Sequence, residues 1–403
     1  MDKKIAPELR FDGFTEPWEE KRLTDFGCFY SGLTYSPMDI VKSGGTLVLR
    51  SSNVQSGEIS LTDNVYVDNH AVNSENVNFG DIVIVVRNGS RSLIGKHATV
   101  KTPLTDTVIG AFMAGYRTPN YKFVNALLDT SNFKQEVDKN LGATINQITN
   151  GMFSVMSFPV PYEAEMKPIG HLFCYLDSLI SQQEKKCAVL GEARDALLDK
   201  MFPKEGETEP ELRFEGFTGP WEQRKLGDLL AESDERSSTE EILSVSVANG
   251  IYPASESDRD TNPGASIANY KIVRVGDIVY NSMRMWQGAV GSSRYNGIVS
   301  PAYVVAKPVV ELDSTCFGYL LKRPEMLYKY LCESQGNSKD TQTLRYERFA
   351  EITAEIPSTI EEQRAISDCL ASLDSLITLH QRKYEKLRTL KSAMLDKMFP
   401  KGA

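Results

Sequence analysis

Apolar residues recur at alternating steps of four and three along two long segments of the chain, a spacing typical of heptad helices. The second segment runs from about Glu361 to Met398. Its core positions are Ile366, Leu370, Leu373, Ile377, His380, Tyr384, Leu387, Lys391, Met394 and Met398. The corresponding positions 197 residues earlier (366 minus 169) are Ile169, Phe173, Leu176, Ile180, Gln183, Cys187, Leu190, Arg194, Leu197 and Met201. The pattern predicts two long amphipathic helices, which Pro203 and Pro400 should end.

The two heptad patterns are interrupted by polar residues at the same places. Gln183 matches His380, and Arg194 matches Lys391. The helices could each pack on their own domain, or they could pair with each other as a coiled coil. We favour an antiparallel pair, because polar residues at core positions fix the register of a coiled coil at some cost in stability. A two-fold axis through such a pair would place the two variable parts at opposite ends.

The chain is an internal duplication. PELRFDGFTEPWE at Pro7–Glu19 returns as PELRFEGFTGPWE at Pro210–Glu222. LDKMFPK at Leu198–Lys204 returns at Leu395–Lys401, and the polar linker KEGETEP joins the two halves. A repeated frame with a different middle suggests one task performed at two places.

The middles, roughly residues 20–160 and 223–357, are predicted to be mixed α/β. In each, Gly-Asp followed by a β-branched run predicts a turn and a strand, in GDIVIVVR (Gly80–Arg87) and GDIVYNSMR (Gly276–Arg284). Two further matched apolar segments are VIGAFMAGYR (Val108–Arg117) with VSPAYVVAKP (Val299–Pro308), and SFPVP (Ser157–Pro161) with AEIPS (Ala354–Ser358). The expected fold is α+β, with two mixed α/β domains at 1–162 and 207–359 and two helices at 163–206 and 360–403.

Composition narrows the class of protein. The 403 residues are 41% apolar and 25% charged, as in ordinary globular proteins. No apolar run approaches the ~18 residues of a membrane span, and the first residues lack a secretory signal, so we expect a cytoplasmic protein. The six cysteines are scattered without a C-x-x-C pair, and no two histidines stand at helical ligand spacing, so no metal site is expected. The net charge of −9 disfavours non-specific coating of DNA and leaves room for local basic patches or a shared partner.

Motifs of catalysis are missing from the sequence. There is no G-x-x-x-x-G-K-[ST] loop, no G-x-G-x-x-G after a strand, no H-E-x-x-H and no G-x-S-x-G. An Asn-Pro-Pro-aromatic segment of the kind that holds a flipped base is missing too. We therefore expect a binding protein without catalytic residues or a cofactor of its own.

Two polar loops in each half carry the groups that read bases. One follows each GDIV strand, at Arg87–His97 and Asn281–Gly291, and another comes later, at Gly142–Phe153 and Ser334–Tyr346. Arg pairs with guanine, Asn and Gln pair with adenine, and Ser pairs with either base in the major groove. The candidate DNA-binding residues are Arg87, Asn88, Ser90, Arg91, Lys96, Asn146, Gln147, Asn150, Asn281, Arg284, Gln287, Asn337, Lys339, Gln342 and Arg345. Trp286 could either pack beneath its loop or touch DNA.

Together, the repeated PELRF-x-GF-x-x-PWE segments, the two GDIV strands and the LDKMFPK helix ends resemble the DNA-specificity subunit of Type I restriction-modification systems over the whole chain. The resemblance implies that each variable part is a target recognition domain that reads one half of a bipartite, asymmetric DNA site. It implies that the helices separate these domains and dock two methyltransferase subunits, which methylate adenine with S-adenosylmethionine. A motor-nuclease subunit using ATP and Mg would join them. Gln183, Arg194, His380 and Lys391 would then serve helix pairing or partner docking.

The helix length suits this role. About 35 residues at 1.5 Å each span about 50 Å, enough to hold readers over half-sites about one helical turn apart. Two other functions stay open at this point. A stand-alone nuclease would cut DNA with magnesium alone, and a coiled-coil adaptor would bind protein without selecting a DNA sequence.

Overall fold

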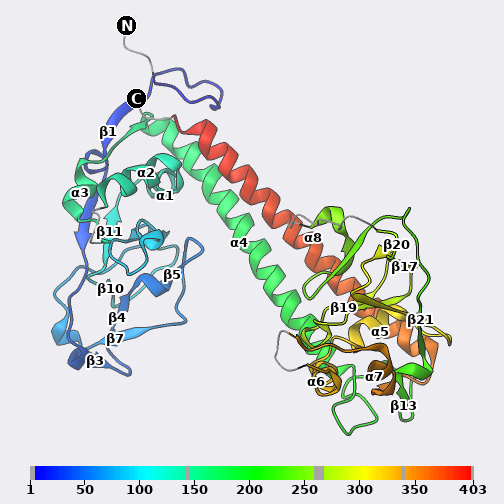
Figure 1. Cartoon of the computed structure of the whole chain (residues 1–403). Coiled ribbons are helices and arrows are strands. Elements are labelled where there is room, and N and C mark those ends of the chain that lie inside the picture. The colour runs from blue at the N-terminus through cyan, green and yellow to red at the C-terminus, as the bar shows by residue number, and fades with distance from the viewer. Residues whose placement is uncertain (1–4, 142–145, 258–266, 337–340, 401–403) are drawn as a thin grey trace. The chain divides into compact units, whose positions relative to one another are not determined.

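The computed structural model describes residues 5–141, 146–257, 267–336 and 341–400. The chain forms two compact units, one of residues 1–186 with 380–403 and the other of residues 187–379. Each unit combines one variable part with portions of both long helices, labelled α4 and α8 in Figure 1. The predicted domain boundaries instead separate each variable part from the long helix that follows it. This division remains a prediction.

The variable part of the first unit is a mixed α/β fold. Its helices are α1 (Tyr121–Asp129), α2 (Ser131–Asn140) and α3 (Asn150–Val155), with short 3-10 turns at η1 (Leu23–Asp25), η2 (Pro37–Asp39), η3 (Ser51–Asn53), η4 (Asn69–Ala71) and η5 (Arg91–Leu93). Its strands are β1 (Glu19–Arg22), β2 (Cys28–Ser31), β3 (Ile40–Val41), β4 (Thr46–Leu49), β5 (Val54–Gln55), β6 (Glu58–Ile59), β7 (Val65–Val67), β8 (Ile82–Val85), β9 (His97–Thr99), β10 (Thr107–Ile109), β11 (Met113–Arg117) and β12 (Ser157–Val160). They form sheets of order β2-β11-β8-β9 and β10-β4-β7-β3, and pairs β1-β12 and β5-β6.

The predicted GDIV strand is confirmed as β8, which is buried along its whole length. Gly80 turns the chain into it with φ +88°, a backbone conformation that glycine adopts readily. The next residue, Asp81, is buried and accepts hydrogen bonds from the Tyr30 hydroxyl at 2.8 Å and from Arg117 Nε and Nη2 at 2.9 and 2.8 Å. These bonds tie β8 to β2 and β11, so the loop that leaves the other end of β8 starts from a fixed point.

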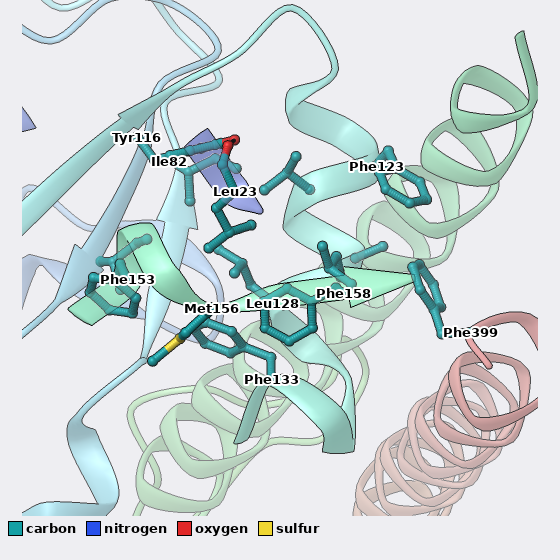
Figure 2. Close-up of a cluster of buried hydrophobic side chains, with 14 of the residues drawn as sticks. Leu23, Ile82, Tyr116, Phe123, Leu128, Phe133, Phe153, Met156, Phe158 and Phe399 are labelled. Carbon is teal, nitrogen blue, oxygen red and sulfur yellow. Dashed lines mark hydrogen bonds between the residues drawn. The ribbon is translucent and has the colours of Figure 1, made fainter. Parts of the chain in front are cut away.

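The main core of this unit is rich in aromatic rings. Figure 2 shows Phe133, Phe153 and Phe158 gathered around Leu128 and Met156. Phe399, just beyond α8, packs against Phe123 and Trp18 with ring centroids 5.5 and 5.9 Å apart. The end of the second helix therefore completes the core of the first unit.

The second unit repeats this plan. Its helices and 3-10 turns are α5 (Ser314–Leu320), α6 (Pro324–Glu333), α7 (Tyr346–Glu351), η6 (Leu226–Asp228), η7 (Ala254–Glu256) and η8 (Met285–Gln287). Its strands are β13 (Glu222–Lys225), β14 (Leu230–Glu232), β15 (Leu243–Ser246), β16 (Gly250–Pro253), β17 (Lys271–Val273), β18 (Ile278–Asn281), β19 (Val290–Ser292), β20 (Gly297–Val299), β21 (Tyr303–Pro308) and β22 (Thr353–Ile356). The order β14-β21-β18-β19 matches β2-β11-β8-β9, and the pair β13-β22 matches β1-β12. The second GDIV strand is confirmed as β18.

One of the matched apolar segments contains parts of two strands. Val108–Arg117 is not one strand: β10 ends at Ile109 and β11 begins at Met113. Gly110 instead makes an isolated bridge to Leu33. The break leaves Phe112 at the surface, immediately before β11.

The long helices are α4 (Glu163–Lys200) and α8 (Ile360–Met398), and they end before Pro203 and Pro400 as predicted. Within the first unit they are antiparallel, because Gln183 contacts His380 whereas Phe173, earlier in α4, packs against Phe399. Within the second unit they are antiparallel too, with Arg194 bonded to Asp374 and Phe202 in the same core as Ile366. Every predicted heptad core position is buried or half-buried. The fold class is therefore confirmed as mixed α/β domains joined to two long antiparallel helices.

The repeated PELRF segments fasten the beginnings of these helices. Arg10 bonds the buried Glu165 of α4 through Nε and Nη2, both at 2.7 Å, and Arg213 bonds the buried Glu362 of α8 at 2.7 and 2.9 Å. Each arginine also donates to a backbone carbonyl of its own segment, at Glu16 or Gly219, at 2.6 Å. The motif is thus a structural clamp on the first turn of each helix.

Candidate nucleic-acid interface

The first polar loop leaves the end of β8 with an exposed arginine. The Arg87 guanidinium lies over the Phe112 ring, with 4.9 Å between Cζ and the ring centroid. Next to it, the Asn88 Oδ1 accepts a hydrogen bond from the Ser90 backbone N–H at 3.0 Å, which fixes a tight turn. The Ser90 hydroxyl lies 2.9 Å from that of Ser92. The half-buried Asn88 also donates through its side-chain amide to the Ser51 hydroxyl at 3.2 Å, so the loop is held in place while Arg87 and Ser90 stay exposed.

The second polar loop of this half joins the first. The Ile148 N–H donates to the Val86 carbonyl at 2.9 Å, and Gln147 forms a bridge with Arg87. The Asn146 side-chain amide donates to the Gly89 carbonyl at 3.1 Å. Residues 142–145 of this loop lie outside the described residues. Two segments that are far apart in the sequence thus form one polar surface, which the sequence alone did not show.

The other candidates of the first half have different surroundings. Asn150 is not in a loop as predicted: it opens α3, whose N-cap Thr149 ends the loop, and it donates to the Ser31 hydroxyl at 3.0 Å. Arg91 donates to the Asp138 carbonyl at 3.2 Å, with the Asp138 carboxylate 3.7 Å from its Nε. Lys96 is half-buried and lines, with these two residues, a groove of about 390 Å³. Arg91 and Lys96 therefore line a groove in which an acidic side chain already pairs with the arginine.

The second half joins its two polar loops through an equivalent bond. The Leu344 N–H donates to the Ser282 carbonyl at 2.8 Å. Ser282 lies 196 residues after Val86, and Leu344 lies 196 residues after Ile148 (282 minus 86; 344 minus 148). The duplication has therefore kept the backbone contact that brings the loops together while the side chains around it have changed.

The arginines of the second half are open to solvent. Arg284 stands at the start of η8 and Arg345 at the start of α7, and neither guanidinium has a hydrogen bond or ion pair with any other residue that the structure describes. Gln287 is exposed, while Asn281 accepts the Met283 N–H at 3.0 Å. This part of the surface offers unpaired cationic donors.

The remaining candidates of the second half are less exposed or lie outside the described residues. The Gln342 side-chain amide donates to the Gly336 carbonyl at 3.3 Å, while its buried Oε1 has no partner among the described residues. Asn337 and Lys339 lie outside the described residues. Trp286 packs against the second core, so the packing alternative describes its position.

The polar residues of the helix cores form bonds between the helices. His380 Nδ1 lies 2.7 Å from Gln183 Oε1. Lys391 Nζ lies 2.5 Å from a carboxylate oxygen of Asp129 and 2.5 Å from one of Asp177. Burial disfavours the charged ammonium, but the two carboxylates outweigh it and hold the pKa of Lys391 above its ordinary value.

The equivalent arginine of the second unit also bonds an aspartate of the opposite helix. Arg194 Nε lies 3.1 Å from Asp374, which is 197 residues after Asp177 (374 minus 177). The sequence reasoning missed both aspartates. The sequence contained a signal for them, because Asp177 directly follows the predicted core residue Leu176, and Asp374 directly follows Leu373.

The described part of the chain supports neither a metal site nor a membrane-spanning helix. Between residues 5 and 400, apart from the gaps given above, no three His, Cys, Asp or Glu side chains are grouped as metal ligands. Across the same residues no helix is long and apolar enough to cross a membrane.

Comparison with known proteins finds similarity to one family. Residues 219–389 match the family model described as the Type I restriction modification DNA specificity domain. The match covers less than half of the chain, in its second half. The chain is 27% identical over 232 residues to the Type I restriction enzyme StySPI specificity subunit of Salmonella potsdam, covering 54% of this chain and 49% of that protein. It is 27% identical over 195 residues to the EcoKI specificity subunit of Escherichia coli (strain K12), covering 45% of this chain and 42% of that protein.

The chain therefore spans about half the length of the curated specificity subunits that it matches. A solved structure, the S subunit of the Type I restriction-modification system from M. genitalium, covers 99% of this chain and 100% of its own, with a TM-score of 0.65 and 13% identity. At that identity the likeness concerns the fold. The likeness of fold extends over both units, beyond the residues that the family model matches.

Proposed function

We propose that the chain is the DNA-specificity subunit of a Type I restriction-modification complex. Each half reads one part of a bipartite, asymmetric DNA site, through the surface formed by its two polar loops. The observation that carries the proposal is the repeated bond between loops, Ile148 to Val86 and Leu344 to Ser282. It brings a different set of base-reading side chains to the same place in each half.

The chain itself is proposed to be non-catalytic and to need no cofactor. The long helices dock two methyltransferase subunits, which use S-adenosylmethionine to methylate adenine, and restriction subunits that use ATP and Mg cleave unmodified DNA. Gln183, Arg194, His380 and Lys391 are proposed to set the pairing of the helices to which these partners bind, in the cytoplasm. The half-buried polar contacts of these residues support this role, since polar bonds within a helix pair specify register.

The test is methylome sequencing of cells that carry the chain together with its methyltransferase subunit. A bipartite adenine-methylated motif is expected, and it should disappear when the chain is omitted. Combined Arg284→Ala and Arg345→Ala substitutions should degrade one part of the motif, and Arg87→Ala should degrade the other. If either set relaxed both parts equally, the assignment of one reader to each half would be wrong.

Two rival functions predict other results. A nuclease would cut DNA when the purified chain is incubated with magnesium alone. An adaptor would bind the methyltransferase subunit without enriching any sequence from a random pool of duplexes.

A further inference from the structure

An exposed aromatic ring stands beside the arginine of the first reader. The Phe112 side chain is 54% exposed, although the residue follows an apolar run. The guanidinium of Arg87 covers one face of its ring at 4.9 Å from the centroid. Stacking on an aromatic face holds a guanidinium in place while leaving the N–H groups at its edge free to donate.

The backbone fixes this pair at the ends of two neighbouring strands. The Phe112 carbonyl accepts hydrogen bonds from the Val86 N–H at 3.0 Å and the Arg87 N–H at 3.2 Å. The next residue, Met113, pairs with Val85 in the sheet. Gln147 of the second polar loop bridges to Arg87. The ring therefore belongs to the surface where both loops meet, and it is anchored there by main-chain bonds.

We propose that Phe112 is a specificity-determining residue of the first reader, whose ring contacts the C5-methyl group of a thymine beside the base bound by Arg87. This inference rests on the proposed function. Thymine alone presents a methyl group in the major groove, and a phenylalanine ring is a suitable apolar partner for it. A large ring left half in water at a polar binding surface gains most if such a contact removes it from water.

The second reader provides an internal comparison. There the bond equivalent to Val86–Phe112 runs from the Ser282 N–H to the Ala302 carbonyl at 3.4 Å, so alanine stands where the first reader has phenylalanine. The ring contact is thus a property of the first half alone. The second half-site should be unaffected by any change at position 112.

The experiment uses the full chain in complex with its methyltransferase subunit and duplexes carrying the motif found by methylome sequencing. Each thymine of the motif is replaced in turn by deoxyuridine, which lacks only the C5-methyl group. One thymine in the first half-site should lose about fourfold in affinity on this change, the value for one buried methyl-sized group. Phe112→Ala should bind the thymine and deoxyuridine duplexes equally well, whereas Phe112→Leu should keep part of the difference.

Phe79→Ala is the matched control. Phe79 is 57% exposed in the same unit, but it precedes β8, whereas Arg87 follows that strand. This variant should discriminate thymine from deoxyuridine as the wild type does. Circular dichroism and the thermal midpoint of each variant verify that it is folded.

The outcomes separate this inference from the proposed function. A bipartite motif whose first part contains no methyl-sensitive thymine, or a Phe112→Ala variant that keeps the full preference for thymine, overturns the role of Phe112 and leaves the specificity function standing. If the wild-type complex selects no motif at all, the proposed function itself fails.

Discussion

Replacing Lys391 should destabilise the first unit more than replacing Lys386, which is exposed on the same helix. Its Nζ bonds Asp129, at the end of α1, and Asp177, on α4, and its side chain is only 16% exposed. Lys391→Met keeps the length and helix propensity of the side chain but removes the charge. Asp177 is then left facing an apolar group, and Asp129 keeps the His97 ring, whose Nε2 lies 3.6 Å from its carboxylate.

The magnitude follows from the burial of these groups. Removing one partner of a buried ion pair costs about 3–5 kcal/mol, because the other charge remains buried without compensation. Here the carboxylates of Asp129 and Asp177 keep 31% and 23% of their side-chain exposure, so water relieves part of the cost. We therefore expect a loss of about 2–4 kcal/mol in the free energy of unfolding.

The assay is thermal and denaturant unfolding of the full chain, followed by calorimetry and circular dichroism. Lys386→Met is the control, since Lys386 is exposed on the same helix and should change stability by about 0.5 kcal/mol or less. The triple variant Lys391→Met, Asp129→Asn, Asp177→Asn should recover much of the loss, because no unpaired charge remains buried. A single variant as stable as the control, or a triple variant no better than the single, would refute the reasoning.

The same cluster predicts the pH dependence of stability. The pKa of Lys391 is raised in the folded protein above its ordinary value of 10.5, so its contribution is complete below pH 10.5 and is lost as the pH rises through the higher folded value. The difference in stability between wild type and Lys391→Met should therefore be constant from pH 7 to pH 9 and should shrink above about pH 10.5. A difference that grew with alkaline pH would contradict the assignment of the charge.

Three other predictions concern single contacts. Arg284→Ala should relax recognition of the second half-site by about 1–3 kcal/mol without affecting the first, as measured by competition binding with half-site variants. Arg10→Met should cost about 3 kcal/mol in unfolding measurements, because it leaves the buried Glu165 unpaired, and recovery in a double variant with Glu165→Gln would verify the cause. Joint replacement of Gln183 and His380 by leucine should raise the thermal midpoint but weaken the unique register, which cross-linking of introduced cysteines would report.

The sequence was sufficient for the features that repeat locally. The heptad spacing of α4 and α8 extends over ten core positions in each copy, so the helices and their buried faces could be predicted. The GDIV strands were equally accessible, because a Gly-Asp turn and a β-branched run occur together in both halves. Each of these patterns depends on residues within a few positions of one another.

Contacts between residues far apart in the sequence could not be predicted from these local patterns. The hydrogen bond from the Ile148 N–H to the Val86 carbonyl joins residues 62 positions apart (148 minus 86). No sequence pattern in either loop indicates that it contacts the other. Phe112 was hidden for a similar reason. Its apolar run resembles one strand, and only the separate pairing of β10 with β4 and β11 with β8 breaks the run and exposes the ring.

The ion pairs of the helices show how one frame can carry two different domains. Lys391 and Arg194 bond equivalent aspartates on the opposite helix, so the bond between the helices is the same in both units. The contact with the variable domain differs. In the first unit Asp129 bonds the lysine directly, whereas in the second the Tyr319 hydroxyl donates to Asp374 at 2.6 Å and its ring lies 5.9 Å from the arginine.

Each variable domain that packs on the helix pair must therefore supply a group that bonds either the half-buried cation or the aspartate paired with that cation. A carboxylate does so by pairing with the cation, and a tyrosine does so by donating to the aspartate while its ring faces the guanidinium. The cation on each helix suits its neighbours. The planar guanidinium of Arg194 can stack on the ring of Tyr319, and the compact ammonium of Lys391 can bond two carboxylates. Exchange of Lys391 for arginine should consequently be less well tolerated than its conservative charge suggests, because the two carboxylates lie within 2.5 Å of one compact ammonium nitrogen, where a larger planar guanidinium must displace them.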